Sequence, residues 1–123
     1  MCSLSLFAFG PQWVLTMNRD ESRARAERET LHRIEGPLTQ YAYPVDLQSQ
    51  GSWIAANANG VILALLNRYH EPALHQAKSR GEIIPALIQH GAYELVLSQA
   101  KSLNLECYSP FDLVLVAQGQ LTV

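Results

Sequence analysis

Residues 51–67 constrain the fold of this chain more than any other segment. Two apolar runs, residues 51–57 and 61–67, flank the tripeptide Ala58-Asn59-Gly60. Asn-Gly readily adopts the positive φ angles of a type I′ turn, so the segment predicts a β-hairpin with Asn59-Gly60 at its tip. Both arms are mainly apolar and do not alternate cleanly with polar residues. This pattern is typical of a sheet covered on both faces, so we expect other elements to pack on each side of the hairpin.

Further strands are predicted at the two ends of the chain. Residues 3–9 and 12–17 form two apolar runs that are separated by Gly10-Pro11, which predicts a second hairpin with a tight turn. Residues 111–117 have strand character, and a turn at Gln118-Gly119 leads to a last strand at residues 120–123. The sequence stops within this strand, so we expect the 123 residues to be part of a longer fold.

Two helices are predicted between the second hairpin arm and the last strands. Ser79 and Glu82 have the spacing of a capping box, and apolar residues follow at helical spacing as far as Gly91. We expect that helix to begin near Arg80 and to bend at Pro85, because proline removes one backbone hydrogen bond. A second helix is predicted over residues 92–103.

The remaining segments are predicted to be irregular or exposed. Residues 18–29 are rich in charges of both signs, which suits either a short exposed helix or an ordered loop, with Arg23, Arg25 and Arg28 in solvent. Residues 35–50 contain Pro37 and Pro44 and show little periodicity, so we interpret them as one long loop.

Composition excludes several classes of protein. The chain has 48% hydrophobic and 16% charged residues and a net charge of −2, which argues against disorder and against nucleic-acid binding. No apolar run is long enough to span a membrane, and no signal peptide is evident, so we expect a cytoplasmic location. Two cysteines and four irregularly spaced histidines predict neither a disulfide framework nor a metal site.

Cys2 is the candidate for chemistry. Removal of Met1 would leave its thiol and its free α-amine on one residue, so that nucleophile and base are adjacent. The alternative is inert packing, since cysteine is among the most often buried residues. Equal hairpin arms would bring residues 18–20 beside Cys2, where a carboxylate can hold the ammonium and an arginine favours the thiolate. Residues 18–21 suit a helix start equally well, with Asn18 as its cap. For Trp53, core packing is favoured over ligand stacking.

A set of short motifs carries a resemblance to a known family. They are Met1-Cys2, the tetrapeptide Asn18-Arg19-Asp20-Glu21, Gly51-Ser52-Trp53, Asn57-Ala58-Asn59-Gly60, Leu66-Asn67-Arg68, Ser79-Arg80-Gly81 and Ser109-Pro110-Phe111. In their order and spacing the chain resembles the NRDE family, also called the transport and Golgi organisation 2 family. The similarity covers essentially all 123 residues. It corresponds to the N-terminal half of the longer family fold, so we interpret residues 1–123 as one NRDE-type domain.

The resemblance implies an α+β, N-terminal-nucleophile hydrolase-like fold, an αββα sandwich of antiparallel sheets between helical layers that is incomplete at this length. It implies that Cys2 is the nucleophile, that Asp20 contacts its amine and that Asn67 contributes to the oxyanion hole. The motifs add Asn18, Arg19, Glu21, Trp53 and Asn57 as supporting or substrate-binding residues. Relatives in the cysteine-dependent acylases place an arginine where this chain has Met17, and the arginine here is Arg19.

Three hypotheses for function follow. The first is an amidohydrolase that cleaves a non-peptide carbon–nitrogen amide through a thioester on Cys2 and needs no cofactor. The second is a haem- or lipid-binding trafficking protein that holds a hydrophobic ligand in the same cleft; Cys2 or His32, His70, His75 or His90 would then ligate haem. The third is a structural half-domain that associates with a second copy through exposed strand edges.

Overall fold

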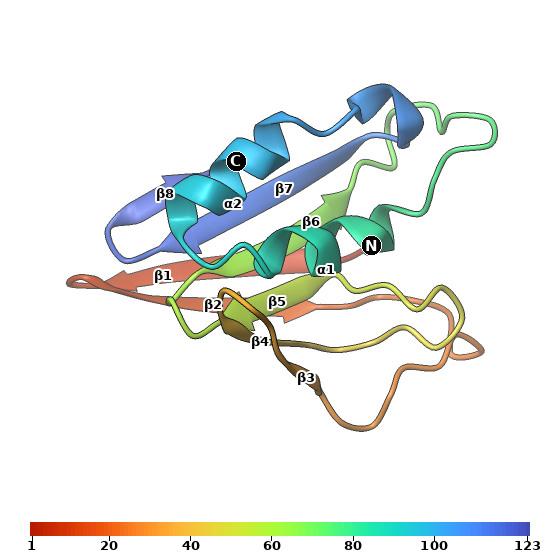
Figure 1. The fold of residues 1–123 in the computed structure, drawn as a ribbon. Coiled ribbons are helices and arrows are strands. Elements are labelled where there is room, and N and C mark those ends of the chain that lie inside the picture. Colours follow the sequence, from red (N-terminus) through yellow and green to blue (C-terminus); the bar gives the residue numbers. More distant parts are fainter.

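The computed structural model describes all 123 residues, which form eight β-strands, two α-helices and two short 3-10 helices (Figure 1). The strands are β1 (Ser3–Phe9), β2 (Gln12–Asn18), β3 (His32–Glu35), β4 (Gln40–Tyr43), β5 (Ile54–Asn57), β6 (Ile62–Asn67), β7 (Phe111–Ala117) and β8 (Gln120–Thr122). The helices are η1 (Arg80–Glu82), α1 (Ile83–Ile88), α2 (Tyr93–Lys101) and η2 (Leu105–Cys107).

The strands form two antiparallel sheets. The β1–β2 hairpin is one sheet, and β3 to β8 form the other as six strands that neighbour one another in sequence order. The helices are inserted between β6 and β7, which pair directly with each other. The predicted α+β class with antiparallel sheets is therefore confirmed.

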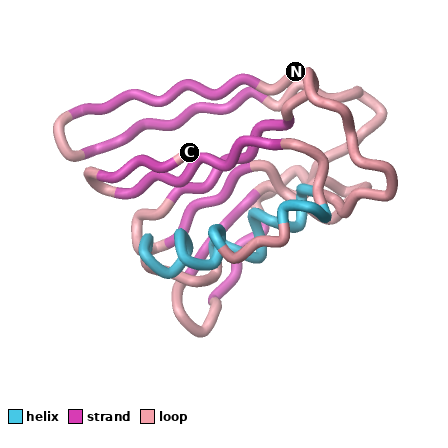
Figure 2. The backbone as a smooth tube through the Cα atoms, turned by 90° about the horizontal axis from the view of Figure 1, so that it is seen from above, coloured by secondary structure: helices cyan, strands magenta, loops and turns pink.

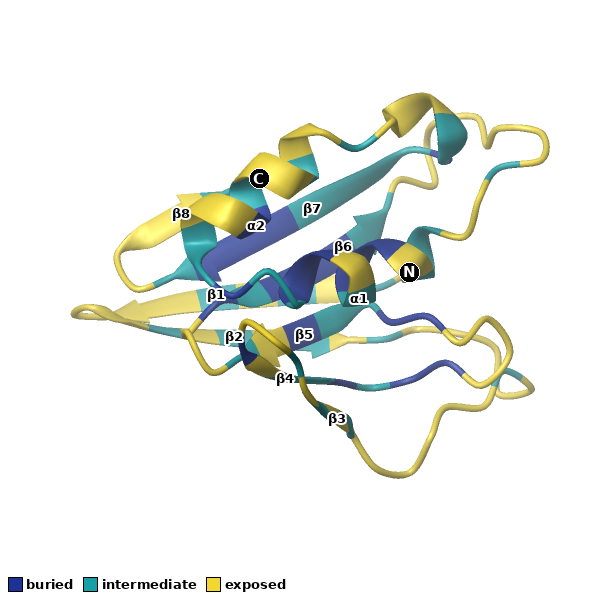
Figure 3. Cartoon of the chain, in the orientation of Figure 1, coloured by how far each residue is buried: buried dark blue, intermediate teal, exposed yellow.

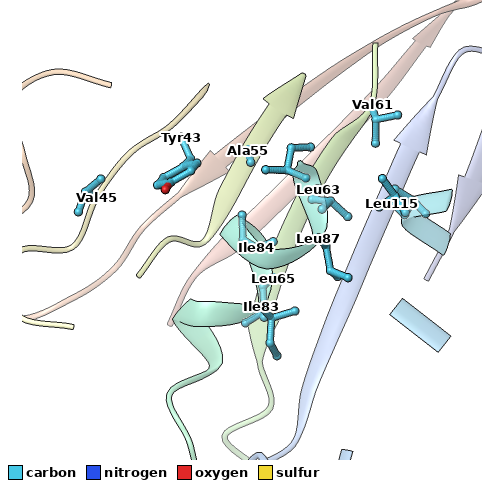
Figure 4. Packing of buried hydrophobic residues seen from close by; sticks show 12 residues of the cluster. Tyr43, Val45, Ala55, Val61, Leu63, Leu65, Ile83, Ile84, Leu87 and Leu115 are labelled. Carbon is cyan, nitrogen blue, oxygen red and sulfur yellow. The ribbon is translucent and has the colours of Figure 1, made fainter. Parts of the chain in front are cut away.

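The six-stranded sheet is covered on both faces, as the apolar arms of β5 and β6 predict. Figure 2 shows the helices on one side of this sheet and the β1–β2 hairpin on the other. On the helical side, Ile84 and Leu87 of α1 pack with Leu63 of β6 in a cluster of 12 buried residues (Figure 4). On the other side, Leu4, Leu6, Trp13, Leu15 and Met17 of the hairpin pack against Ala64, Val114 and Val116.

Exposed residues occur along both strands of the hairpin (Figure 3). Side chains alternate along β1 and β2, so Phe7, Phe9 and Val14 point away from the six-stranded sheet, with 52%, 62% and 47% of their surface accessible. The described residues thus form three layers, and the second helical layer of an αββα sandwich stays a prediction.

The β5–β6 turn differs from the predicted type I′ turn. Asn59 has a negative φ, and Gly60 alone is left-handed, at φ 77°. Gly60 N–H donates to the Asn57 carbonyl at 3.0 Å, and Asn57 N–H donates to the Val61 carbonyl at 3.0 Å. The connection is therefore a three-residue hairpin loop that needs a positive φ only at its glycine.

Of the two segments expected to be irregular or exposed, one differs from the prediction and the other agrees with one of its alternatives. The interpretation of residues 35–50 as one loop is wrong, because β4 lies within it. Pro37 and Pro44 flank β4 instead of interrupting it, and Tyr41 and Tyr43 stack on each other with ring centroids 6.2 Å apart. Residues 18–29 form no helix, so of the two alternatives the ordered loop holds.

Pro85 does not interrupt the first helix. Ser79 accepts a hydrogen bond from Gly81 N–H at 3.3 Å, and the helical segment begins at Arg80, as the capping pattern predicts. Pro85 lies in the first turn of α1, where its missing N–H would have faced the Gly81 carbonyl. That carbonyl instead accepts a hydrogen bond from Ser52 N–H at 2.9 Å. The proline therefore frees an acceptor that ties the start of the helix to the segment before β5.

Candidate functional site

The β1–β2 register places the start of the chain beside the motif that follows β2. Ser3 pairs with Asn18, so the same register brings Cys2 opposite Arg19 and Met1 opposite Asp20. The Met1 ammonium lies 2.6 Å from Asp20 Oδ2. This hydrogen bond raises the pKa of the ammonium and lowers the pKa of the Asp20 carboxyl. The predicted neighbourhood of residues 18–20 and Cys2 is confirmed as a matter of geometry.

A pocket of about 330 Å³ lies next to Cys2. Its walls come from segments far apart in sequence: the start of β1, the loop after β2, the segment before β5, the end of β6 and the segment before η1. The lining residues are Cys2, Arg19, Glu21, Arg25, Asp46, Ser49, Gly51, Ser52, Trp53, Leu65, Asn67, Tyr69, Ala77, Lys78, Ser79, Arg80, Gly81 and Ser109.

The pocket unites most of the predicted site residues. Cys2, Arg19, Glu21, Trp53 and Asn67 all line it. The Asn67 amide lies at the end of β6, where its Nδ2 donates to Tyr69 Oη at 3.2 Å. The site thus brings together a thiol, an amide donor and charged groups.

Three other predicted residues lie outside the pocket lining. Asp20 is exposed and bonds to the terminal amine, and Asn18 is exposed at the end of β2. Asn57 lies on β5, and its side chain has four hydrogen bonds of its own. Its Nδ2 donates to the carbonyls of Ile88 and Gly91, and its Oδ1 accepts from the N–H groups of Asn59 and Val61. Asn57 therefore ties the hairpin turn to the end of α1.

Asp46 is the residue that sequence analysis missed. Its side chain is 4% exposed and bonds to both Arg19 and Arg25, with Arg25 Nε at 2.6 Å. Its Oδ1 accepts the N–H groups of Gln48 and Ser49, each at 2.9 Å. Burial alone would raise the pKa of this carboxyl, but the Ser49 and Arg25 hydrogen bonds outweigh burial and lower it. Asp46 is therefore an ionised, buried anchor for two arginines.

The arginines are correspondingly fixed. Arg25, expected in solvent, is instead shared between Asp46 and Glu21. Arg19 also reaches Glu27 at 3.6 Å, and its guanidinium lies 4.4 Å from the centre of the Trp53 ring. Trp53 is thus half-buried under an arginine instead of inside the apolar core. Arg19 shares the pocket with Cys2, but its charge is balanced by Asp46 and Glu27.

Two glycines form one wall of the pocket by close backbone contact. A Cβ atom at Gly51 would lie 2.7 Å from the Gly81 Cα, and one at Gly81 would lie 3.1 Å from the Gly51 Cα. The Ser52 hydrogen bond to the Gly81 carbonyl lies at the same crossing. Only glycine allows the segment before β5 and the start of η1 to approach so closely.

These features define an α+β protein of two antiparallel sheets with a charged pocket beside the first residues of its N-terminal hairpin. A family model described as Transport and Golgi organisation 2 matches residues 1–122, so the chain belongs to this family. Comparison with curated proteins found no match.

None of the helices is both long and apolar enough to cross a membrane. No group of three or more His, Cys, Asp or Glu side chains is arranged to hold a metal ion.

Proposed function

We propose that this chain is an N-terminal-nucleophile amidohydrolase that cleaves a non-peptide carbon–nitrogen amide through Cys2, in the cytoplasm. The observation that carries the proposal is the arrangement at the start of β1. Cys2 lines a pocket, and a carboxylate, Asp20, lies 2.6 Å from the terminal amine one residue away. Family membership is consistent with this role.

The residues suit the chemistry after Met1 is removed. The α-amine of Cys2 takes the proton of the thiol, and Asp20, whose side chain is 71% exposed and free to follow the amine, stabilises the resulting ammonium. The thiolate attacks the amide carbonyl carbon, and Asn67 Nδ2 donates to the oxyanion that forms. The ammonium then protonates the departing amine and leaves a thioester. Water, deprotonated by the α-amine, attacks the thioester, releases the carboxylic acid and restores the thiol.

The first test combines intact mass with thiol labelling. The purified chain is treated briefly with iodoacetamide near neutral pH, and the labelled cysteine is mapped. Both thiols are free and half-buried, so Cys107 serves as an internal reference. We expect loss of Met1, faster labelling of Cys2 than of Cys107, and slower labelling of Cys2 in Asp20→Asn. Retention of Met1, or a Cys2 no faster than Cys107, would contradict the hydrolase proposal.

Haem or lipid binding in the same pocket remains the alternative prediction from the sequence. Most of the lining residues are polar or charged, which favours a polar ligand over a purely apolar one. Titration with haem tests the alternative directly. A Soret shift that is lost in Cys2→Ala, combined with slow iodoacetamide labelling of the wild type, would favour carriage over hydrolysis.

A further inference from the structure

The charged side chains of the pocket are paired unequally. Glu21 and Asp46 are both engaged by arginines, Glu21 by Arg25 and Asp46 by Arg19 and Arg25. Lys78 and Arg80 line the same pocket, and neither takes part in any ion pair of the structure. Four cations and two anions therefore face the pocket, and the two unpaired charges are both positive.

Arg80 is held in place without being neutralised. Its Nη1 donates to the Pro110 carbonyl at 2.7 Å, and this is the one hydrogen bond that its guanidinium makes to the protein. A guanidinium has five N–H donors, so most of them remain free for a ligand. No buried side-chain nitrogen or oxygen lacks a partner, which means that the free donors of Arg80 reach the pocket or solvent.

Arg68 provides a comparison with Arg80, because its charge is neutralised by carboxylates. It bonds to Asp112 and Glu71, which raise the pKa of its guanidinium. Arg80 is half-buried and forms no ion pair, and burial lowers its pKa, although an arginine remains charged at any physiological pH. A half-buried, unpaired arginine carries a desolvation cost that an incoming anion would offset.

We propose that Arg80, supported by Lys78, binds a carboxylate or phosphate group of the ligand that lies beside Cys2. The planar fork of an arginine matches both anions, and the flexible ammonium of Lys78, an exposed residue of the pocket lining, adds attraction. Taken with the proposed function, on which this step rests, the substrate class is an amide that carries an acidic group. The amide carbonyl faces Cys2, and the acidic group faces Arg80.

The first experiment compares two alkylating reagents that differ in charge. Iodoacetate and iodoacetamide both form a sulfur–carbon bond with Cys2 and release iodide, but only iodoacetate is an anion. We expect Arg80→Gln to lower the ratio of the iodoacetate to the iodoacetamide rate at Cys2 by about threefold, the effect of one charge several ångströms away in water. Arg80→Lys keeps the charge and should keep the ratio.

The matched control is Arg33→Gln. Arg33 lies on β3, is exposed, makes no ion pair and does not line the pocket, so this variant removes the same charge elsewhere. Its ratio should equal that of the wild type. An unchanged ratio in Arg80→Gln, or an equal fall in Arg33→Gln, would overturn the anion site even if Cys2 is fully reactive.

The second experiment does not depend on Cys2. Thermal unfolding is measured with added phosphate, with added glutarate and with chloride at matched ionic strength. A ligand that binds only the folded state raises the midpoint, so phosphate or glutarate should raise Tm in the wild type and in Arg33→Gln but not in Arg80→Gln. The anion that gives the larger rise identifies the preferred group. If neither raises Tm, the anion site is wrong. Slow labelling of Cys2 together with a Tm rise would instead reject hydrolysis and retain the anion site.

Discussion

Asp46 joins two segments through its side chain as well as through its backbone, which forms an isolated antiparallel bridge with Glu27. Arg19 and Arg25 belong to the loop after β2, and Asp46 belongs to the segment before β5, so their ion pairs close one side of the pocket. The carboxylate is buried, and each of its oxygens has partners from the protein. Removing a partner from a buried ion pair is far more costly than removing one on the surface.

We therefore expect Asp46→Asn to lower the free energy of unfolding by about 3 kcal/mol, measured by urea denaturation. Asp112→Asn is the matched control. Asp112 pairs with the half-exposed Arg68, so its loss should cost less than about 1 kcal/mol. Equal losses in the two variants would show that Asp46 contributes no more than a surface ion pair.

The pKa of Asp46 also predicts a pH dependence. Because the folded state lowers this pKa, the carboxylate adds stability that is complete above the unfolded pKa of about 3.9 and is lost as the pH falls through the folded value. The wild type should therefore lose stability below about pH 4 more steeply than Asp46→Asn does. Parallel curves of unfolding free energy against pH for the two proteins would contradict this assignment.

Asn57 is expected to act on stability and not on chemistry. Its side chain makes four hydrogen bonds to backbone groups of the hairpin turn and of the end of α1. Asn57→Ala should lower the free energy of unfolding by about 2 to 3 kcal/mol, whereas Asn59→Ala, which removes a side chain with no hydrogen bonds, should change it little. Iodoacetamide labelling of Cys2 should be unchanged in both variants. If folded Asn57→Ala selectively lost Cys2 reactivity, Asn57 would have a role in the candidate site and not only in stability.

The residues around Cys2 could be predicted from the sequence because the length of a hairpin turn determines which residues pair. A two-residue turn at Gly10-Pro11 with equal arms places Ser3 opposite Asn18, and the same register places Cys2 opposite Arg19. Asp46 could not be found in this way, since it lies in an irregular segment and its partners are brought to it by tertiary folding. Its one local signal is the turn in which Oδ1 accepts the N–H groups of Gln48 and Ser49.

At the level of elements, the pocket wall depends on how closely η1 approaches the segment before β5. The contact is between backbones, at Gly51 and Gly81, and the Ser52 hydrogen bond to the Gly81 carbonyl holds it. Pro85 contributes indirectly, because it leaves that carbonyl free of a helical partner. A single methyl group at this crossing should therefore separate the two elements.

We expect Gly51→Ala to cost about 3 kcal/mol and Gly81→Ala about 1 kcal/mol in urea denaturation. The order follows from the space available, since the added Cβ would lie 2.7 Å from backbone atoms in the first variant and 3.1 Å from the nearest one in the second. The reverse order would mean that the crossing relaxes in a way that these distances do not capture.

Elements with strong local signals were predictable and those defined by tertiary pairing were not. The β1–β2 and β5–β6 hairpins and both helices follow from apolar runs, turn residues and a capping pattern. β4 was missed because two prolines and two tyrosines gave no clear alternation, and its pairing with β3 and β5 supplies the order instead. The type of the β5–β6 turn was missed because Asn-Gly also suits a three-residue loop with one left-handed glycine.

At the scale of the whole molecule, the candidate site lies between two layers. The hairpin supplies Cys2 and Arg19, and the six-stranded sheet with its connecting segments supplies Trp53, Asn67 and Arg80. No strand of the hairpin pairs with a strand of the larger sheet, so side-chain packing, together with the ion pairs of Asp46, sets the distance between the two halves of the site. An isolated hairpin is marginally stable in water, which makes this packing decisive.

Two neighbouring residues of β1, Leu6 and Phe7, provide a test of this packing, because only Leu6 packs against the six-stranded sheet. Leu6 is half-buried against the cluster of Ala64, Val114 and Val116, whereas Phe7 points the other way and is 52% exposed. Leu6→Ala should lower the free energy of unfolding by about 2 kcal/mol, and Phe7→Ala should change it by about 0.5 kcal/mol or less. Under conditions in which both variants remain folded, Leu6→Ala should also slow iodoacetamide labelling of Cys2 relative to Cys107, because the thiol loses its fixed place beside the pocket. If Leu6→Ala destabilises the fold but leaves the labelling ratio of the two cysteines unchanged, Cys2 owes its reactivity to the hairpin alone and not to the pocket between the layers.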